Sequence, residues 1–439
     1  GSYTRFCYNR QLFSQSTHLL MPEFNTAIPA PNSTRSPSIH WMEAGLAQSA
    51  QWRSERGAAP PPRVVLADDT LSADAAYRLA CAGTALLWRG DFQNARQLLQ
   101  ALARRIDKVP ARKKRPPAKT AAGTPVTTDP ATQFHLHRQA QAQRARILGM
   151  VLLPFNADFS IPLGRAPDAR TACTEAWGPP IPGQGASVAT LRDLLGIISA
   201  HEWRKKGVEI AALGAAPHNR VFPHYGVFSP LRGEYIELVA QAPLPVAEAD
   251  RQAMVAFDIG TGTGVLAAVL ARRQVGQVVA TDMDARALEC ARANLAQLGV
   301  AAQVQVLATD LFPPGRADVI VCNPPWLPAR PSSPVEYAVY DENSRMLLGF
   351  LAGLAAHLTP RGEGWLIVSD FAEHLGLRSR AELLSAIDQA GLTVLGRLET
   401  KPQHPKTRDA SDALHFARVA EVTSLWRLGA VTTTTQPLF

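Results

Sequence analysis

The hydrophobic pattern is clearest in the C-terminal half, where short apolar runs alternate with longer amphipathic segments. Short apolar runs of this kind are typical of buried parallel strands, whereas apolar residues that repeat every three or four positions indicate helices. The alternation predicts an α/β fold with a seven-stranded, mostly parallel sheet and helices on both faces. The strands are expected at residues 255–257, 278–282, 304–307, 319–321, 365–369, 392–398 and 422–428, with the last two antiparallel at the sheet edge.

The N-terminal half shows helical spacing and little strand pattern. Residues 1–62 are rich in Ser, Pro, Ala and Asn, which predicts an irregular or disordered segment. Ser72 is a suitable cap for a first helix, and helical spacing recurs twice after it. We therefore predict a mainly helical N-terminal domain. The helices are expected at about 72–88, 92–106 and 134–151, and the two domains at 63–180 and 187–439.

A glycine-rich turn follows the first predicted strand of the sheet and reads Asp258-Ile259-Gly260-Thr261-Gly262-Thr263-Gly264. Glycines allow a backbone to pass within van der Waals distance of a nucleoside, because no Cβ stands in the way. A dinucleotide-binding turn would carry its third glycine at position 265, where this chain has valine. That difference, and the acidic Asp258 at the strand end, favour S-adenosyl-L-methionine (SAM), which has no pyrophosphate to bind.

Polar residues also follow the next two predicted strands. Asp282 ends the second strand about 20 residues after the glycines, where a carboxylate can accept both ribose hydroxyls, and Met283 follows it. Asp310 and Leu311 follow the third strand, where they could bind the adenine amino group and one face of its ring. Three such signals at three successive strand ends together predict a SAM site. Its expected residues are Asp258, Gly260, Thr261, Gly262, Gly264, Asp282, Met283, Asp310 and Leu311.

The motif Asn323-Pro324-Pro325-Trp326 follows the fourth predicted strand. With it, residues 187–428 resemble class I SAM-dependent methyltransferases, and specifically N-methyltransferases with an Asn/Asp-Pro-Pro-Tyr/Phe/Trp sequence. The resemblance implies a Rossmann-like catalytic domain, SAM as cofactor and S-adenosyl-L-homocysteine as product. It also implies that the Asn323 side-chain oxygen and the Pro324 carbonyl accept the N–H groups of a planar nitrogen, while Pro325 offers no donor and Trp326 stacks on the acceptor. Asn323 is expected to border the cofactor as well. Such catalysis works by orientation and electrostatics, without a metal.

The segment from Val208 to Leu354 further resembles HemK-type enzymes, the release-factor glutamine N5-methyltransferases. In that family a hairpin and a proline-arginine segment cover the cofactor and the acceptor, which implies that the hairpin at 207–230 is a roof. The match is loose at Asp341, which stands where the family has a glutamate. Four residues are candidates for the acceptor or cofactor wall, although ordinary packing explains the first three equally well: Tyr225, Phe228, Arg232 and Tyr340.

The resemblance leaves more than one acceptor open. It favours a glutamine side-chain amide in a protein of the translation apparatus, with the domain at 63–180 recognising that macromolecule. The same motif also serves exocyclic amino groups of adenine and guanine in RNA or DNA, and Gly226-Val227-Phe228-Ser229 resembles ribosomal guanine methyltransferases. A non-catalytic binding module of this fold is a third hypothesis. It would be favoured by loss of Asn323 or of the glycines, and all of them are present.

Charge and cysteine content narrow the location and the partners. The net charge of +8 comes almost entirely from residues 104–119, which hold eight Lys and Arg residues and one acidic residue. This predicts a basic, proline-rich linker at 108–130, which suits a ribosome-associated protein acceptor and an RNA acceptor equally. The five cysteines include no CxxC pair, which favours the reducing cytoplasm and no metal site. No apolar run reaches the ~20 residues that span a membrane.

Overall fold

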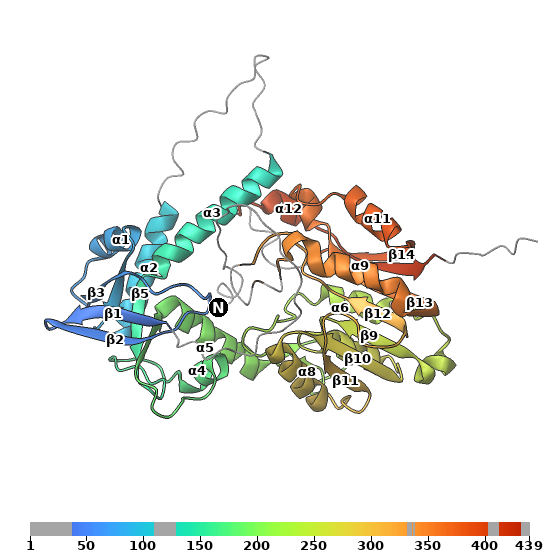
Figure 1. The fold of residues 1–439 in the computed structure, drawn as a ribbon, viewed down its shortest axis with the longest axis horizontal. Coiled ribbons are helices and arrows are strands. Elements are labelled where there is room, and N and C mark those ends of the chain that lie inside the picture. The colour runs from blue at the N-terminus through green and yellow to red at the C-terminus, as the bar shows by residue number, and fades with distance from the viewer. Residues whose placement is uncertain (1–36, 109–128, 332–335, 337–338, 403–411, 432–439) are drawn as a thin grey trace, which may run out of the picture. The chain divides into compact units, whose positions relative to one another are not determined.

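The computed structural model describes residues 37–108, 129–331, 336, 339–402 and 412–431. These residues form two compact units, which are labelled in Figure 1 by their helices and strands. The N-terminal unit contains the described residues up to 108 together with 138–199, and the C-terminal unit contains 129–137 and the described residues from 200 onward. The two units are described separately below.

The C-terminal unit is built on a seven-stranded sheet, as predicted. Every neighbouring pair is parallel except those that involve β15, which is antiparallel to both β13 and β14. The predicted antiparallel pair at one sheet edge is therefore confirmed. In spatial order the strands are β11 (Val304–Ala308), β10 (Gln277–Asp282), β9 (Val255–Ile259), β12 (Ala317–Cys322), β13 (Leu358–Ser369), β15 (Thr423–Ala430) and β14 (Leu392–Thr400).

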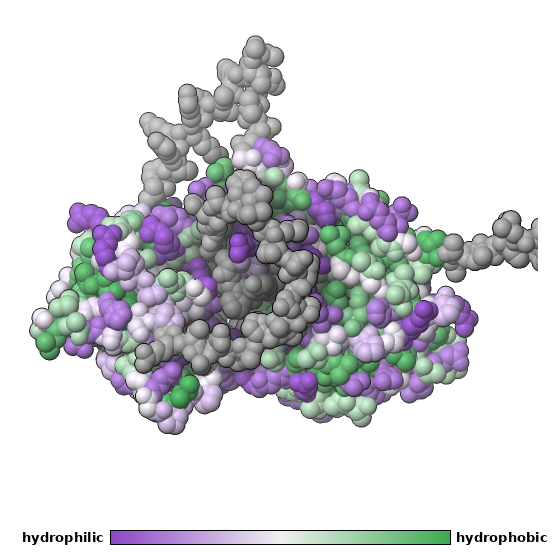
Figure 2. Space-filling model, viewed as in Figure 1, coloured by the Kyte–Doolittle hydropathy of each residue, from purple (hydrophilic) through white to green (hydrophobic). Residues whose placement is uncertain are grey.

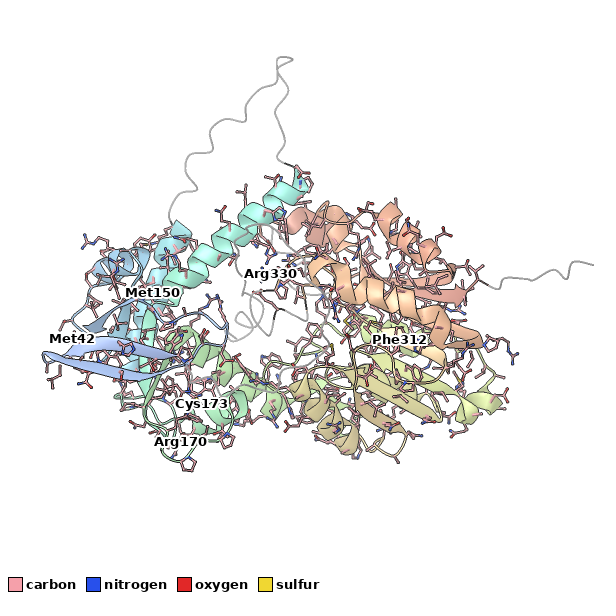
Figure 3. All side chains as sticks on the ribbon, in the orientation of Figure 1. Met42, Met150, Arg170, Cys173, Phe312 and Arg330 are labelled. Carbon is pink, nitrogen blue, oxygen red and sulfur yellow. The ribbon has the colours of Figure 1, made fainter. Side chains whose placement is uncertain are left out.

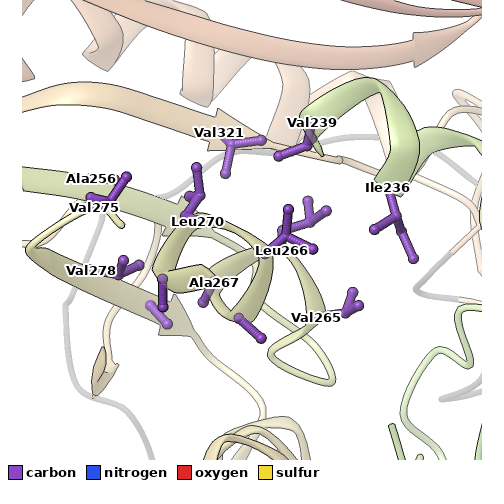
Figure 4. Close-up of a cluster of buried hydrophobic side chains, with 14 of the residues drawn as sticks. Ile236, Val239, Ala256, Val265, Leu266, Ala267, Leu270, Val275, Val278 and Val321 are labelled. Carbon is purple, nitrogen blue, oxygen red and sulfur yellow. The ribbon is translucent and has the colours of Figure 1, made fainter. Parts of the chain in front are cut away.

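Helices cover both faces of this sheet, and each face has its own apolar cluster. Helix α7 (Val265–Arg272) is apolar all round, and its residues 265–271 are all buried, as expected for a helix enclosed by other elements. Figure 4 shows α7 side chains among residues of α6 (Glu234–Gln241) and of the sheet. The second cluster packs α9 (Arg345–His357) and α11 (Arg380–Gln389) on the sheet. The other helices are α8 (Ala285–Gln297), α10 (Phe371–His374) and α12 (His415–Ala420).

The strand order reverses at β9, which pairs with β10 on one side and with β12 on the other. In open α/β sheets, ligands bind at this kind of switch point, outside the carboxyl ends of the strands. Cys322, the last residue of β12, pairs with Ile259, the last residue of β9. The glycine turn and the Asn-Pro-Pro-Trp turn therefore leave adjacent strands at the same level.

The N-terminal unit is also an α/β structure, so the prediction of a mainly helical domain was wrong. Its six-stranded sheet mixes parallel and antiparallel pairs. In spatial order the strands are β1 (Ser38–Glu43), β2 (Leu46–Trp52), β6 (Ser187–Thr190), β5 (Val151–Phe155), β4 (Thr84–Trp88) and β3 (Arg63–Ala67). The helices are α1 (Ala73–Cys81), α2 (Phe92–Lys108), α4 (Arg170–Trp177), and parts of α3 (Pro130–Leu148) and α5 (Leu191–Lys206).

The helix predicted at about 72–88 ends early. Ser72 caps it as predicted, because its Oγ accepts from the Ala75 N–H over 3.2 Å. Gly83, at a φ of +77°, then stops the chain from continuing as a helix. Residues 84–88 are all buried and form β4. A continuous apolar run of this length fits a buried strand and a buried helix equally, which explains the error.

Two further boundaries differ from the predictions. Residues 38–52, expected to be irregular, form the β1–β2 hairpin, and residues 1–36 lie outside the described part. Strand β6 at 187–190 belongs to the N-terminal unit, so the chain passes between the units near residue 200 rather than near 187. Most of the linker predicted at 108–130 lies outside the described residues.

The described surface carries both polar and apolar residues. Figure 2 shows hydrophilic and hydrophobic residues intermixed on the face turned to the viewer. Exposed apolar side chains include Leu348 on α9 and Leu384 on α11. Among the described residues no helix is both long and apolar enough to cross a membrane.

Candidate active site

The glycine turn after β9 is shaped by three left-handed residues. Gly260, Gly262 and Gly264 have φ values of +73°, +56° and +81°, a region that residues with a Cβ rarely adopt. The N–H groups of Gly260 and Thr261 donate to the Thr281 carbonyl over 2.9 and 2.8 Å, which holds the turn against the end of β10. A Cβ at Gly262 would meet no other atom within 4 Å. The turn therefore presents Gly262 to open space.

Asp258 is buried and holds the glycine turn in place. Its carboxylate accepts from the Thr261 hydroxyl over 2.6 Å and from the Ala267 N–H over 3.0 Å. Burial raises the pKa of Asp258 to about 6, and the charge of Asp282 adds to the rise. Of the predicted cofactor residues, Asp258 and Thr261 thus act on each other within the turn.

Asp282 stands at the end of β10 and connects two turns. One carboxylate oxygen accepts from the Gly262 N–H and the other from the Asp284 N–H, both over 3.0 Å. Burial raises the pKa of Asp282 as well. Each oxygen retains a lone pair that could accept a ribose hydroxyl. Met283, beside it, has 64% of its surface exposed and offers an apolar patch.

The segment after β11 is held in an uncommon conformation. Leu311 has a φ of +63°, which is rare for a bulky residue, and its carbonyl accepts from the Thr281 hydroxyl over 2.6 Å. Asp310 pairs with Arg345 of α9 over 2.6 Å at a half-exposed position. Phe312, labelled in Figure 3, stacks on Phe350 of α9 and on His357. The predicted adenine-binding residues are thus anchored to both β10 and α9.

The Asn-Pro-Pro-Trp turn after β12 contains an internal hydrogen bond. The indole Nε1–H of Trp326 donates to Asn323 Oδ1 over 3.0 Å. Pro324 is buried, whereas Asn323, Pro325 and Trp326 are partly exposed. The guanidinium of Arg232 lies over the Trp326 ring, 5.5 Å from its centroid. The structure thus places Arg232, which was predicted to line the acceptor or cofactor site, against the predicted catalytic motif.

Arg232 is held by a buried network that the sequence did not reveal. It pairs with Glu234 and with Glu421, each over 3.1 Å. Glu421 is buried and also accepts from the Ser369 hydroxyl over 2.7 Å. Burial alone would lower the pKa of the Arg232 guanidinium, but the two carboxylates outweigh it and raise that pKa. Glu421 is 189 residues from Arg232 in the chain, so only the fold could pair them.

The hairpin predicted at 207–230 is present only as two short paired strands, β7 (Val208–Glu209) and β8 (Arg220–Val221), and its role as a roof stays a prediction. The segment after β8 is fixed by Asn294 of α8, which pairs with the backbone of Phe222 and donates to the Thr263 carbonyl over 3.0 Å. Asn294 thereby joins this segment to the glycine turn. Its amphipathic helix gave no sign of this role.

The two aromatic candidates after the hairpin lie in different surroundings. The Tyr225 ring faces Arg286 in the first turn of α8, 5.7 Å from the guanidinium carbon. This places Tyr225 near the chain segment that follows Asp282. Phe228 instead packs against the apolar cluster around α7.

Tyr340 and Asp341 mark the start of α9. Tyr340 is buried in a cluster with Leu327 and Phe371. The Asp341 carboxylate accepts from the N–H groups of Met346 and Leu347 over 2.9 to 3.1 Å, and so caps the helix. Met346, which the sequence did not single out, lies against Gly260, since a Cβ there would be 2.4 Å from its Cε.

The described residues contain no group of three or more His, Cys, Asp or Glu side chains arranged to hold a metal ion. The site is built from backbone turns, the carboxylates of Asp258 and Asp282, and the amide of Asn323. Its central feature is that the turns after β9 and β12 lie beside each other.

Residues 220–382 match the family model of the methyltransferase small domain. A ribosomal protein L11 methyltransferase from Pelotomaculum thermopropionicum is 46% identical over 69 residues, which cover 15% of this chain and 22% of that protein. A release factor glutamine methyltransferase from Cereibacter sphaeroides is 31% identical over 157 residues, 33% of this chain and 55% of that protein. A ribosomal RNA small subunit methyltransferase C from Sodalis glossinidius is 49% identical over 72 residues, 16% of this chain and 20% of that protein. The chain thus spans about half or less of these relatives.

Proposed function

We propose that this chain is an N-methyltransferase, on the premise that residues 220–382 are a methyltransferase small domain within a class I fold, whose cofactor is SAM. The observation that carries the proposal is the pairing of Cys322 with Ile259. Because of it, the motif that would hold an acceptor nitrogen lies beside the turn that would hold the cofactor. The two turns are therefore placed to bring a methyl donor and an acceptor nitrogen together.

The residues of the site fit a cationic nucleoside cofactor. The backbone at Gly262 faces open space, and Asp282 would accept the ribose hydroxyls. Asp310 and Leu311 would bind the adenine. Asp258 and Asp282 have carboxyl pKa values raised by burial, and a nearby sulfonium charge would favour the ionised forms of both.

The Asn-Pro-Pro-Trp turn would hold the acceptor. When bound, SAM supplies a methyl group on a positively charged sulfur, and the acceptor nitrogen gains that methyl group and loses one proton. The Asn323 side-chain oxygen and the Pro324 carbonyl would accept the two N–H groups of a planar nitrogen, which turns its lone pair toward the methyl group. Trp326 would stack on the planar group. These contacts lower the barrier by orientation and by hydrogen-bond electrostatics.

A glutamine side-chain amide in a translation-related protein is the acceptor that we favour. The release factor glutamine methyltransferase matches over 157 residues, the longest of the three segments described above. We further propose that the N-terminal unit contributes to recognition of this macromolecule and that the protein acts in the cytoplasm.

An exocyclic amino group of adenine or guanine in RNA or DNA is the second candidate. It is supported by the 49% identity with ribosomal RNA small subunit methyltransferase C, over a shorter segment of 72 residues. A non-catalytic role is disfavoured, because Asn323 and all three glycines of the turn are retained.

The test is to incubate the protein with SAM carrying a radiolabelled methyl group and with a cell extract that contains ribosomes. Label that protease removes and nuclease does not would support the glutamine acceptor, whereas the reverse would move the proposal to a nucleic acid base. Asn323→Ala is the control, and we expect it to lose transfer while its SAM affinity, measured by calorimetry, stays unchanged. Wild-type labelling no greater than that of Asn323→Ala would contradict the proposed reaction.

A further inference from the structure

The hydrogen bond from Trp326 to Asn323 has a consequence for the proposed reaction. A side-chain amide has an accepting oxygen and a donating NH2 group, and a half-turn about its last bond exchanges the two. An NH2 group directed at the acceptor would repel an N–H donor, so only one of the two orientations suits an acceptor amine or amide. The indole N–H selects that orientation, because it can donate to the oxygen and not to the NH2 group. The oxygen retains a second lone pair for the acceptor.

The Trp326 ring is itself fixed from one side. Arg232 lies over the ring at 5.5 Å and is held by two carboxylates, of which Glu421 is 3% exposed. A guanidinium fixed at both ends cannot readily move away from the ring. One face of Trp326 is therefore covered by the guanidinium of Arg232, so an acceptor would have to stack on the other face.

We infer that Trp326 and Arg232 are positioning residues: Trp326 sets the amide orientation of Asn323, and Arg232 holds the Trp326 ring in place. This inference rests on the proposed function and adds two positioning residues to it. A primary amide or an exocyclic amine is neutral and supplies two N–H groups, one for Asn323 and one for the Pro324 carbonyl.

The indole N–H distinguishes Trp326 from the other aromatic residues that fit the motif. Phenylalanine has no polar group, and the hydroxyl of tyrosine stands at the far end of its ring. Trp326→Phe therefore retains a stacking surface and removes only the donor. We expect kcat to fall roughly tenfold, the effect of one lost hydrogen bond of about 1.4 kcal/mol, with the KM for the acceptor and the SAM affinity little changed.

The position of Asn323 can be tested without any activity measurement. Protein labelled with nitrogen-15 in its tryptophan indoles gives one N–H resonance for each indole, and Trp326→Phe identifies the resonance of Trp326. We expect Asn323→Ala to shift that resonance and to leave Trp365 in place, since the Trp365 indole donates to Glu363 over 3.1 Å. A Trp326 resonance that does not shift in Asn323→Ala would overturn the inference, whether or not the protein transfers methyl groups.

Arg232 is tested in the same spectra. We expect Arg232→Met to shift the Trp326 resonance away from its wild-type position. Arg232→Lys should shift it less, because a positive charge remains beside the ring. Arg397→Met is the matched control, since Arg397 lies 4.8 Å from the centroid of the Trp426 ring and should affect only that indole. With an active wild type, equal kcat in Arg232→Met and wild type would also refute the positioning role. With an inactive wild type the proposed function fails, and the spectra alone decide the arrangement.

Discussion

At the scale of single residues, burial disfavours the ionised forms of two carboxylates at the ends of β9 and β10. Asp258 and Asp282 are both removed from water, and burial raises the pKa of each. Neither has an ion pair among the described residues, and backbone N–H groups stabilise both charges only in part. A positively charged ligand in the turn would supply the missing compensation.

The first prediction concerns pH. The folded pKa of Asp258 is about 6, above its ordinary value of 3.8, so ionising this buried carboxyl costs folding stability as the pH rises between these values. A cation favours the ionised form, so SAM affinity should increase up to about pH 6 and then level off. Calorimetry across this range tests it, with S-adenosyl-L-homocysteine as control, because its neutral sulfur should show a weaker dependence. Equal dependence for both ligands would contradict the explanation.

The second prediction concerns Asp282 itself. Asp282→Ala should weaken SAM binding by roughly 1.5–3 kcal/mol, the value of hydrogen bonds to a charged group. Asp284→Ala is the matched control, because Asp284 carries the same charge two residues later but caps α8 through the Arg286 N–H. That variant should lose about 1 kcal/mol of stability and no affinity. Calorimetry and chemical denaturation separate the two effects, and unchanged affinity in Asp282→Ala would refute the ribose assignment.

At the scale of elements, the hydrophobic pattern predicted the C-terminal sheet because each buried strand is bounded by polar turns. The same pattern failed at Thr84–Trp88, where a strand follows a helix after only Ala82 and Gly83. The site motifs were readable because they are local in sequence. Their supports were not, since Asn294 reaches Phe222 across 72 residues and Glu421 reaches Arg232 across 189. No spacing rule encodes such contacts.

The third prediction belongs to the connection between α8 and the glycine turn. Asn294 is 1% exposed and makes three hydrogen bonds to the backbone of Phe222 and Thr263. Asn294→Ala leaves these buried groups unpaired and should cost roughly 1–3 kcal/mol of folding stability, with weaker SAM binding as the turn loosens. Gln297→Ala, at an exposed position of the same helix, should change neither quantity. Denaturation and calorimetry of both variants provide the measurement.

At the scale of the whole molecule, each unit draws on distant parts of the chain. Residues 129–137, which include the start of α3, belong to the C-terminal unit, where Phe134 completes the cluster around Leu327 and Phe371. Sequence order placed these residues in the N-terminal domain. Their assignment depends on three-dimensional packing, which periodicity along the chain does not specify.

The fourth prediction tests this assignment. Phe134 is 1% exposed, so Phe134→Ala should destabilise the C-terminal unit by roughly 3–5 kcal/mol through loss of buried contacts. Leu136 on the same helix is 55% exposed, and Leu136→Ala should have little effect. Chemical denaturation followed through tryptophan fluorescence compares the two. Similar stability for both variants would show that the cluster does not need the start of α3.

Thr281 is fully buried, receives two N–H groups from the glycine turn through its carbonyl, and holds Leu311 through its hydroxyl. The loops expected to contact the ribose and the adenine are therefore mechanically linked through one residue of β10. A substitution that moves one loop must disturb the other, so few substitutions in this half of the site would preserve cofactor binding. New acceptor preferences would then arise at the Asn-Pro-Pro-Trp turn, through changes around Arg232 and Trp326.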